Sequence, residues 1–411
     1  MLHIFFRITN NLLFITLFCC LWDFLPDKIR KLYMTGRINY ITNHSRKLKF
    51  YETLKSSELK YFPFVSKTII KKNIGNIFFK DKATYGSKFT SGSSGVPFEI
   101  PKWKYSDWLE FLIGERAFYR VIGFKLRPNV LVIRSFSPKP GEKITKYSLL
   151  RNWYYYSPYH INKSNIKTLL DYYNKVKPTI LKGYPSTIFS FTSLLLENNI
   201  KLNSPKLIFT SSETFPSEWR KIIENYWSCP IIDWYGQNER TVIVSQCEFG
   251  NYHTNDDYGI LEIDEKTNEI IATSLWNNIM PFIKYRTGDL AIPLREPIKC
   301  KCNNKGPVQI SGIIGRIDDM LIDGNNDKIP PTNFYSLFEK FDLKGFQILQ
   351  KKDLSINVMI EGWNNINNNQ QILIKNELLS RVKGQRLIIQ SVDKIKRSTV
   401  TNKIKIIKRE K

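Results

Sequence analysis

The sequence has few histidines and cysteines and no long uncharged apolar run. It has four histidines, none of them beside a serine motif, which argues against a Ser-His-Asp hydrolase. Six cysteines in 411 residues are too few for a disulfide framework. The apolar run from Leu12 to Trp22 is shorter than the ~20 residues that a bilayer-spanning helix needs.

The residues after this run also lack the small-residue cleavage site of a signal peptide. We therefore expect a cytoplasmic chain whose N-terminal run forms a helix. That helix either packs on the body of the protein or rests on a membrane face, which would give a peripheral membrane contact through residues 1–25.

Acidic residues are scarce, since 37 Asp and Glu stand against 62 Lys and Arg and give a net charge of +25. Such a charge is typical of nucleic-acid-binding proteins when the basic residues cluster. Here the lysines are scattered among abundant Asn and Ile, so a general compositional bias explains the charge and nucleic-acid binding is not expected. The densest basic run, Lys394 to Lys411, is interpreted as a solvated face or an active-site edge.

Two common phosphate-binding patterns, G-x-x-x-x-G-K-[ST] and G-x-G-x-x-G, are absent from the stretch where small residues concentrate. That stretch reads TSGSSGVP from Thr90 to Pro97. Its glycines allow successive backbone N–H groups to converge on an anion, as a phosphate loop requires. A flexible Ser/Gly linker is the alternative. Phe89 before the loop and the extended segment 96–101 after it favour a tight loop between strands.

Helical and apolar extended segments alternate through the middle of the chain, which predicts βαβ units and a parallel sheet. The expected strands are 179–181, 206–210 and 231–233, and the expected helices are 186–198 and 217–227. Residues 260–294 change to short alternating strands, which predicts a β-rich subdomain. The predicted fold is therefore α/β, with a large N-terminal domain (1–316) of mixed parallel sheets and a β-rich subdomain. A small mobile α+β domain (317–411) follows it.

Five motifs occur in a fixed order along the chain. They are TSGSSGVP (90–97), SSETFP (211–216), WYGQNER (234–240), YRTGDL (285–290) and GRIDDMLIDGNNDKIPP (315–331). Taken together, they resemble the adenylate-forming superfamily of acyl- and aryl-CoA synthetases. The resemblance is stronger to its phenylacetate-CoA ligase-like branch, which includes CapK-type proteins of polysaccharide gene clusters. KGYPS (182–186) also fits that branch.

The resemblance implies a set of ATP- and AMP-binding residues. Thr90, Ser91, Gly92, Ser93, Ser94 and Gly95 would hold the phosphates. Tyr235 and Gly236, or Ser212 and Glu213, would lie against the adenine, Asp289 would accept hydrogen bonds from the ribose hydroxyls, and Arg316 matches the junction between the domains. Glu239 matches the catalytic acidic residue that handles Mg²⁺, a hard cation that prefers carboxylates. Taken alone, YRTGD would be an ordinary Gly-Asp turn after a strand.

The resemblance also places a hinge and a catalytic lysine in the C-terminal part. Asp318 matches the hinge about which the small domain rotates between the two half-reactions, with a surface Asp-Asp turn as the alternative. Lys403 matches the lysine that stabilises charge on the reacting carboxylate and α-phosphate, and Lys405 is a substitute. Two positions depart from the family pattern. Asn238 replaces a hydroxyl residue, and Asn402 replaces a glycine.

Three thiols and one imidazole form a second candidate site in the β-rich part. Five residues separate Cys247 from His253, and Cys300 and Cys302 follow further along. These four side chains are enough to complete a tetrahedral zinc site, and a similar arrangement occurs in some relatives of this branch. We expect a structural Zn²⁺, with unrelated buried cysteines and a surface histidine as the alternative.

The function implied by the resemblance is an ATP- and Mg²⁺-dependent ligase that converts a small carboxylic acid to an acyl-adenylate. It would then pass the acyl group to CoA, another thiol or an amine, in a pathway such as surface polysaccharide biosynthesis. The altered residues at 238 and 402 leave a second interpretation, in which a catalytically impaired protein of this fold acts as a nucleotide-binding or scaffold component of glycan assembly.

Overall fold

The computed structural model describes most of the chain and divides it into two compact units. The described residues are 12–79, 86–89, 99–124, 127–139, 141–296, 298–317, 320–323, 328–329, 334, 337, 341, 343, 345–382, 384–396 and 406–410. The first unit comprises residues 1–124 and 234–313, and the second comprises 125–233 and 314–411. The chain passes from one unit to the other at 124/125, 233/234 and 313/314. The second of these divisions falls inside strand β9 (Ile231–Gly236), and the third falls inside strand β15 (Val308–Arg316).

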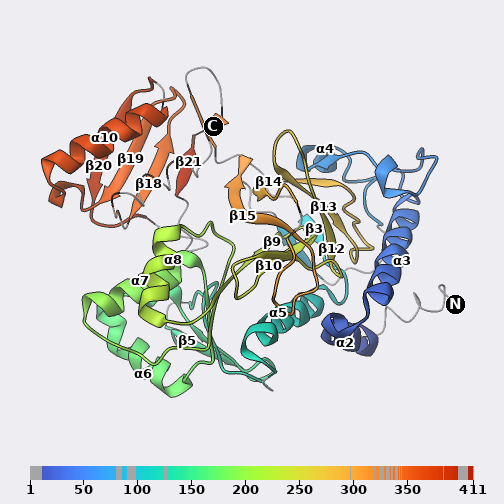
Figure 1. Ribbon diagram of the computed structural model, residues 1–411, viewed down its shortest axis with the longest axis horizontal. Coiled ribbons are helices and arrows are strands. Elements are labelled where there is room, and N and C mark those ends of the chain that lie inside the picture. Colours follow the sequence, from blue (N-terminus) through green and yellow to red (C-terminus); the bar gives the residue numbers. More distant parts are fainter. Residues whose placement is uncertain are drawn as a thin grey trace. The chain divides into compact units, whose positions relative to one another are not determined.

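Helices form the N-terminal part of the first unit, shown in blue and cyan in Figure 1. They are α2 (Leu12–Leu21), α3 (Asp27–Ser45), α4 (Lys67–Lys72) and α5 (Ser106–Ile122), with short turns η1 (Trp22–Phe24) and η2 (Leu59–Tyr61). Pro26 separates η1 from α3, because the residue before a proline disfavours the helical conformation. The apolar side chains of α5 recur at helical spacing at Leu109, Leu112 and Ile113, and they enter one core with those of α2 and α3.

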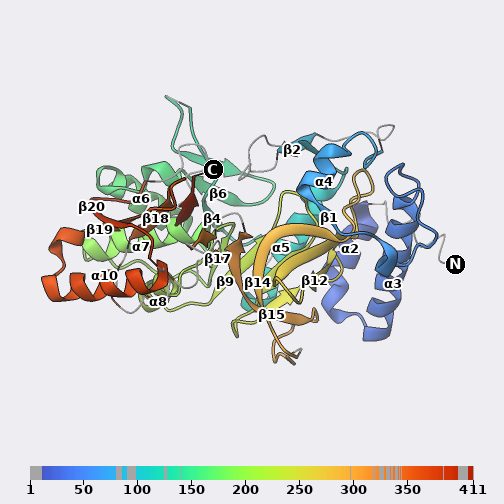
Figure 2. The ribbon, with the colours of Figure 1, turned by 90° about the horizontal axis from the view of Figure 1, so that it is seen from above.

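The strands of the first unit form the predicted β-rich part. Their order is β12-β13-β14-β15-β11-β10-β9, with β1 parallel to β14. The strands are β1 (Val65–Ser66), β9 (Ile231–Gly236), β10 (Ile243–Gln246), β11 (Tyr252–Thr254), β12 (Gly259–Ile263), β13 (Glu269–Ser274), β14 (Tyr285–Pro293) and β15 (Val308–Arg316). β2 (Ser87–Phe89) and β3 (Glu99–Pro101) form a separate antiparallel pair. Figure 2 shows β14 and β15 as long curved strands. Buried residues of β10, β13 and β14 share one core.

The second unit contains the predicted βαβ units. β4 (Val130–Ile133) is parallel to both β6 (Trp153–Tyr156) and β7 (Ile180–Gly183), and β7 is parallel to β8 (Leu207–Ser211). β5 (Thr145–Ser148) closes the order β8-β7-β4-β6-β5 as an antiparallel edge strand. The helices are α6 (Ile166–Val176), α7 (Pro185–Glu197) and α8 (Ser217–Trp227), accompanied by the short turns η3 (Pro158–His160) and η4 (Lys163–Asn165). They pack on the sheet through a core that includes Leu131, Leu181 and Ile208.

The C-terminal part of the second unit has the mixed α+β composition that was expected. A four-stranded sheet runs in the order β20-β19-β18-β21. Its strands are β18 (Phe346–Gln350), β19 (Ile356–Glu361), β20 (Leu387–Val392) and β21 (Ile407–Arg409). The turn η6 (Trp363–Asn365) and helix α10 (Asn368–Val382) lie between β19 and β20 in the chain. A separate pair of short strands, β16 (Leu321–Ile322) and β17 (Lys328–Ile329), precedes the sheet in the sequence. Ile374, Leu378 and Val382 form the buried face of α10, which Figure 1 shows in orange beside the sheet.

The predicted fold class is confirmed. The predicted domains 1–316 and 317–411 stay a prediction. Within the described ranges, every helix falls short, in length or in apolar character, of a bilayer-crossing segment.

Candidate functional site

Tyr235 and Asp289 meet inside the first unit. The Tyr235 hydroxyl donates a hydrogen bond to Oδ2 of Asp289 at 2.8 Å, and Nε2 of Gln237 donates to the Tyr235 oxygen at 2.7 Å. Burial, followed by the charge of Asp289, raises the pKa of Tyr235 well above its usual value. The tyrosine therefore keeps its proton and fixes one oxygen of the carboxylate.

A bulge in strand β14 sets the position of Asp289. Ile271 pairs with Arg286 and Glu269 pairs with Leu290, so β14 has extra residues between these two pairs. Gly288 has φ +75°, and its N–H donates to Oε1 of Glu269 at 2.9 Å. The motif YRTGD is therefore not a turn after a strand. It lies within β14, where the glycine supplies a backbone conformation that other residues rarely adopt.

Glu239 lies in the connection between β9 and β10, near the buried Tyr285. The Tyr285 hydroxyl donates to Oε1 of Glu239 at 3.0 Å. No described residue is hydrogen-bonded to the other carboxylate oxygen. A carboxylate held in this way can offer its second oxygen to Mg²⁺, which usually takes one or two carboxylates along with water and phosphate oxygens.

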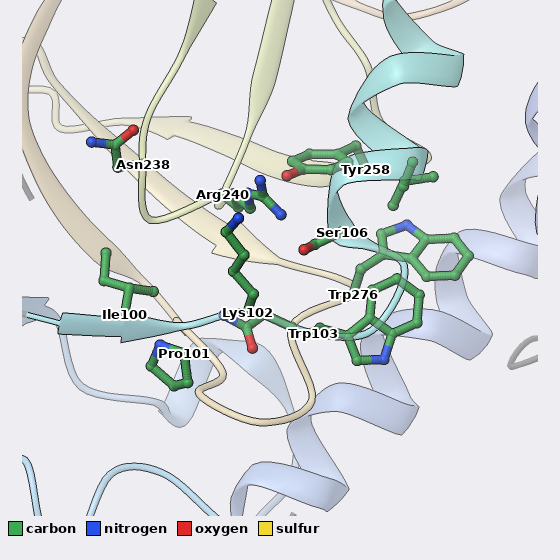
Figure 3. Close-up of a pocket in the computed structure, with 11 residues that line it drawn as sticks. Ile100, Pro101, Lys102, Trp103, Ser106, Asn238, Arg240, Tyr258 and Trp276 are labelled. Atoms are coloured by element: carbon green, nitrogen blue, oxygen red, sulfur yellow. The ribbon is translucent and has the colours of Figure 1, made fainter. Parts of the chain in front are cut away.

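A small pocket of the first unit, shown in Figure 3, lies beside the same connection. It is lined by Ile100, Pro101, Lys102, Trp103, Ser106, Leu109, Asn238, Arg240, Tyr258, Trp276 and Asn277. Its cavity of about 20 Å³ has room for about one water molecule. Asn238 therefore shares a pocket with the strand that follows the Ser/Thr/Gly loop.

Charged side chains support one wall of this pocket. Arg240 is buried and pairs with Asp107 and with Oε1 of Glu110, the latter at 3.2 Å. Lys102 Nζ, which points toward Arg240 in Figure 3, lies 3.2 Å from Oδ2 of Asp107. Arg240 and Lys102 hold the pKa of Asp107 down to about 2 against the effect of its partial burial. The sequence motif contains Arg240 but gives no sign of its partners on α5.

The remaining residues of the predicted nucleotide site lie on separate elements or outside the described residues. Gly236 ends β9 in the first unit. Ser212 and Glu213 follow β8 in the second unit, where Oε2 of Glu213 accepts from the backbone N–H of Ser186 at the start of α7, at 3.0 Å. Arg316 ends β15. Thr90, Ser91, Gly92, Ser93, Ser94, Gly95, Asp318, Asn402, Lys403 and Lys405 lie outside the described residues.

The four candidate zinc ligands come together, with one donor atom from each lying within 4.8 Å of all the others. Cys247 follows β10, His253 lies in β11, and Cys300 and Cys302 precede β15. Sγ of Cys247 is 3.7 Å from Sγ of Cys300, and Sγ of Cys302 is 3.2 Å from Nε2 of His253. Two thiolates at about 2.3 Å from a tetrahedral zinc would be about 3.8 Å apart. The first of these distances therefore fits a metal site and is far too long for a disulfide.

The ring nitrogen of His253 that faces away from the thiols also makes a contact that is usual for a zinc-bound histidine. Nδ1 of His253 lies 2.8 Å from the carbonyl oxygen of Gly306, which leaves Nε2 facing the thiols. Such a contact fixes the orientation of a ligating imidazole. The donor set and its surroundings therefore fit a structural Zn²⁺.

Two relatives match parts of the sequence, and no protein-family model matches it. Protein CapK of Staphylococcus aureus is 27% identical over 275 residues, which is 64% of this chain and 60% of CapK. The indoleacetate–lysine synthetase of Pseudomonas savastanoi is 30% identical over 138 residues, which is 32% of this chain and 33% of the synthetase. The chain thus spans less than two thirds of either relative.

The comparison with solved structures covers more of the chain. The 2-hydroxyisobutyryl-CoA ligase with bound 2-HIB-AMP, in its postadenylation state, has a TM-score of 0.70 and 16% identity. The match covers 94% of this chain and 90% of the ligase. The chain therefore has the fold of the adenylate-forming CoA ligases. This finding confirms the resemblance to their superfamily that was inferred from the five motifs.

Proposed function

We propose that this protein is an adenylate-forming ligase that activates a small carboxylic acid with ATP. An oxygen of the acid's carboxylate would attack the α-phosphorus of ATP, and pyrophosphate would leave with the electrons of the broken P–O bond. A thiol such as CoA, or an amine, would then attack the acyl carbon and release AMP. The observation that best supports this proposal is Asp289, a carboxylate fixed by Tyr235 at the motif where adenylate-forming ligases hold the ribose.

Each proposed role uses a group with suitable chemistry. Asp289 would accept hydrogen bonds from the ribose hydroxyls, and Glu239 would hold Mg²⁺, which supplies charge neutralisation at the phosphates when bound. The loop 90–95 would bind the phosphates through its backbone N–H groups. Lys403 would stabilise the negative charge that develops as the carboxylate and the α-phosphate react.

The remaining details of the activity are also proposals. The acceptor would be CoA or an amine, as the names of the CoA ligase structures and of the lysine synthetase suggest. Asp318 would be the hinge between an adenylation domain (1–316) and a mobile lid (317–411). The site of Cys247, His253, Cys300 and Cys302 would hold a structural Zn²⁺ that ties the loop after β10 to the loop before β15. A cytoplasmic role in surface polysaccharide biosynthesis fits the partial match to CapK.

An acid-dependent exchange of labelled pyrophosphate into ATP tests the adenylation step. A panel of aryl and alkyl carboxylates should contain at least one acid that supports exchange, and Lys403→Ala should abolish it. A Lys352→Ala control, which removes an exposed lysine of the β18–β19 turn, should leave exchange unchanged. Tight ATP binding with no exchange for any acid would instead favour the catalytically impaired scaffold.

Exposed apolar side chains on α2, η1 and α3 support the proposed peripheral membrane contact. These side chains and their exposed fractions are Leu17 (53%), Leu21 (49%), Phe24 (83%), Ile29 (46%) and Leu32 (62%). Exposed Lys28 and Lys31 lie among them on α3 and would attract anionic headgroups. This part of the chain thus supplies the two kinds of side chain that bind a membrane interface, exposed apolar residues and nearby basic residues.

Flotation with anionic and neutral vesicles tests this contact. The wild-type protein should float with the anionic vesicles, and the double variant Phe24→Ser, Leu32→Ser should not. Leu196→Ser, which removes a leucine of α7 that is 48% exposed, is the control. Equal flotation of all three proteins, or of none, would contradict the proposal.

A further inference from the structure

Arg134 occupies the place in the second unit where an α/β sheet binds ligands. Strands β4, β7 and β8 are parallel neighbours, and Ile133, Gly183 and Thr210 are in register near their carboxyl ends. Arg134 follows Ile133 directly, just as Tyr184 and Ser211 follow the other two. Ligands of open parallel sheets bind just beyond these carboxyl ends.

Neutral groups alone hold the Arg134 side chain. Its guanidinium lies over the ring of Tyr184, 4.9 Å from the centroid. Nη1 donates to the Ser211 hydroxyl, and Nη2 lies 3.5 Å from the Ser212 hydroxyl. The Tyr184 hydroxyl is itself hydrogen-bonded to Ser135. The guanidinium is thus contacted by three side chains that carry no charge, and Ser135 supports one of them.

No carboxylate of the described residues forms an ion pair with Arg134. Arg286 of the first unit, by contrast, pairs with both Asp264 and Glu269. Glu213, the carboxylate that follows β8, accepts the N–H of Ser186 at the start of α7. A half-buried, oriented arginine without a counter-ion is suited to an anionic ligand, and its planar fork matches a carboxylate.

The reacting carboxylate of the acid is the less suitable ligand for this arginine. Its charge disappears when the acyl-adenylate forms, so a strong ion pair with it would stabilise the substrate more than the transition state. A second acidic group keeps its charge throughout the reaction and can stay bound. We infer that Arg134 binds a second carboxylate of the substrate, so that the acid that this ligase activates is a dicarboxylic acid. This inference rests on the proposed function.

Pyrophosphate exchange with matched pairs of acids tests the inference. Each pair, such as phthalate with benzoate or glutarate with pentanoate, has one member that lacks only the second carboxylate. The wild-type enzyme should have the higher kcat/KM for the dicarboxylate. Arg134→Gln should lower that value by about 10- to 100-fold, the usual loss of a hydrogen bond to a charged group. The same variant should leave the kcat/KM for the monocarboxylate and the KM for ATP unchanged.

Two further variants separate recognition from folding. Arg134→Lys keeps the charge but loses the fork, so it should retain part of the preference for the dicarboxylate. Arg381→Gln, which removes a partly exposed arginine from α10, should behave as wild type. Thermal unfolding checks that all three variants are folded. If Arg134→Gln unfolds, the kinetics of Arg134→Lys carry the test.

Three outcomes would overturn the inference. The first is that the wild-type enzyme prefers the monocarboxylates and Arg134→Gln does not change this preference. That result would overturn the inference but would leave the proposed ligase activity standing. A rise in the KM for ATP with both members of a pair would assign Arg134 to the nucleotide phosphates. If no acid of either kind supports exchange, the proposed function itself fails and the inference falls with it.

Discussion

The 2.8 Å hydrogen bond from the Tyr235 hydroxyl to Asp289 joins two strands, β9 and β14, that three other strands separate in the sheet order. The two can meet only because the sheet of the first unit curls around its own core, to which Val244, Ala272 and Ala291 contribute. The proposed ribose ligand is therefore positioned by the curvature of the sheet as well as by the bulge at Gly288.

The Asp289→Asn variant should bind ATP about 10- to 100-fold more weakly, because a neutral amide replaces a charged hydrogen-bond acceptor. Tyr235→Phe leaves the carboxylate in place and removes only its support, so a smaller loss of about 3- to 10-fold is expected. Titration calorimetry with ATP measures both. Asp353→Asn, in the exposed turn between β18 and β19, is the control. Wild-type affinity in Asp289→Asn would remove Asp289 from the nucleotide site.

Glu239→Gln should raise the Mg²⁺ concentration needed for half-maximal pyrophosphate exchange and lower the maximal rate, because an amide is a poorer ligand for a hard cation. Tyr285→Phe should shift the Mg²⁺ dependence in the same direction but by less, since it frees the carboxylate without removing it. Glu52→Gln removes an exposed carboxylate elsewhere and should have no effect. An unchanged Mg²⁺ titration in Glu239→Gln would contradict the metal role.

The purified protein should contain about one zinc per chain, as four ligands complete one tetrahedral site. Cys302→Ser should lose most of the metal and unfold at a lower temperature, because a structural zinc site adds its binding free energy to folding. Elemental analysis and thermal unfolding measure the two effects. Cys20→Ser, at an exposed cysteine outside the cluster, should keep both the zinc and the melting temperature. Zinc-free wild-type protein would refute the site.

Local patterns in the sequence predicted the elements of the fold. Alternation of apolar strands such as Leu207–Ser211 with helices such as Ser217–Trp227 requires only the spacing along the chain, and it gave the parallel sheet of the second unit correctly. The cluster of Cys247, His253, Cys300 and Cys302 was predictable as a set because these residue types are rare in the sequence.

The partners of the site residues could not be predicted in the same way. Tyr285 lies 46 residues from Glu239, and Arg240 lies 133 residues from Asp107. Contacts of this kind depend on how the sheet and helix α5 pack, which no local pattern in the sequence records. The position of YRTGD inside β14 was likewise hidden, because a Gly-Asp pair is typical of turns as well as of bulges.

Stability should also depend on pH through Asp256, a carboxyl group beside the buried Arg116–Asp257 ion pair. Burial, followed by the charge of Asp257, raises the pKa of Asp256 to about 6, while Arg30 and Arg116 oppose the shift. In the unfolded chain an aspartate titrates near a pKa of about 3.9. Between these two values the folded state holds more protons, so the free energy of unfolding falls as the pH rises through this window.

Asp256→Asn should therefore stabilise the protein by on the order of 1–3 kcal/mol above pH ~6.5 and leave it unchanged near pH ~4. The amide oxygen can still accept the hydrogen bond that Nε1 of Trp22 donates to Oδ1 at 3.2 Å. Asp257→Asn is the matched contrast. Arg116 donates to both oxygens of Asp257, so the Asp257→Asn variant should have a free energy of unfolding about 3–5 kcal/mol lower than wild type at either pH. Denaturant unfolding at the two pH values measures both variants, and an equal effect of Asp256→Asn at each would show that Asp256 does not titrate between them.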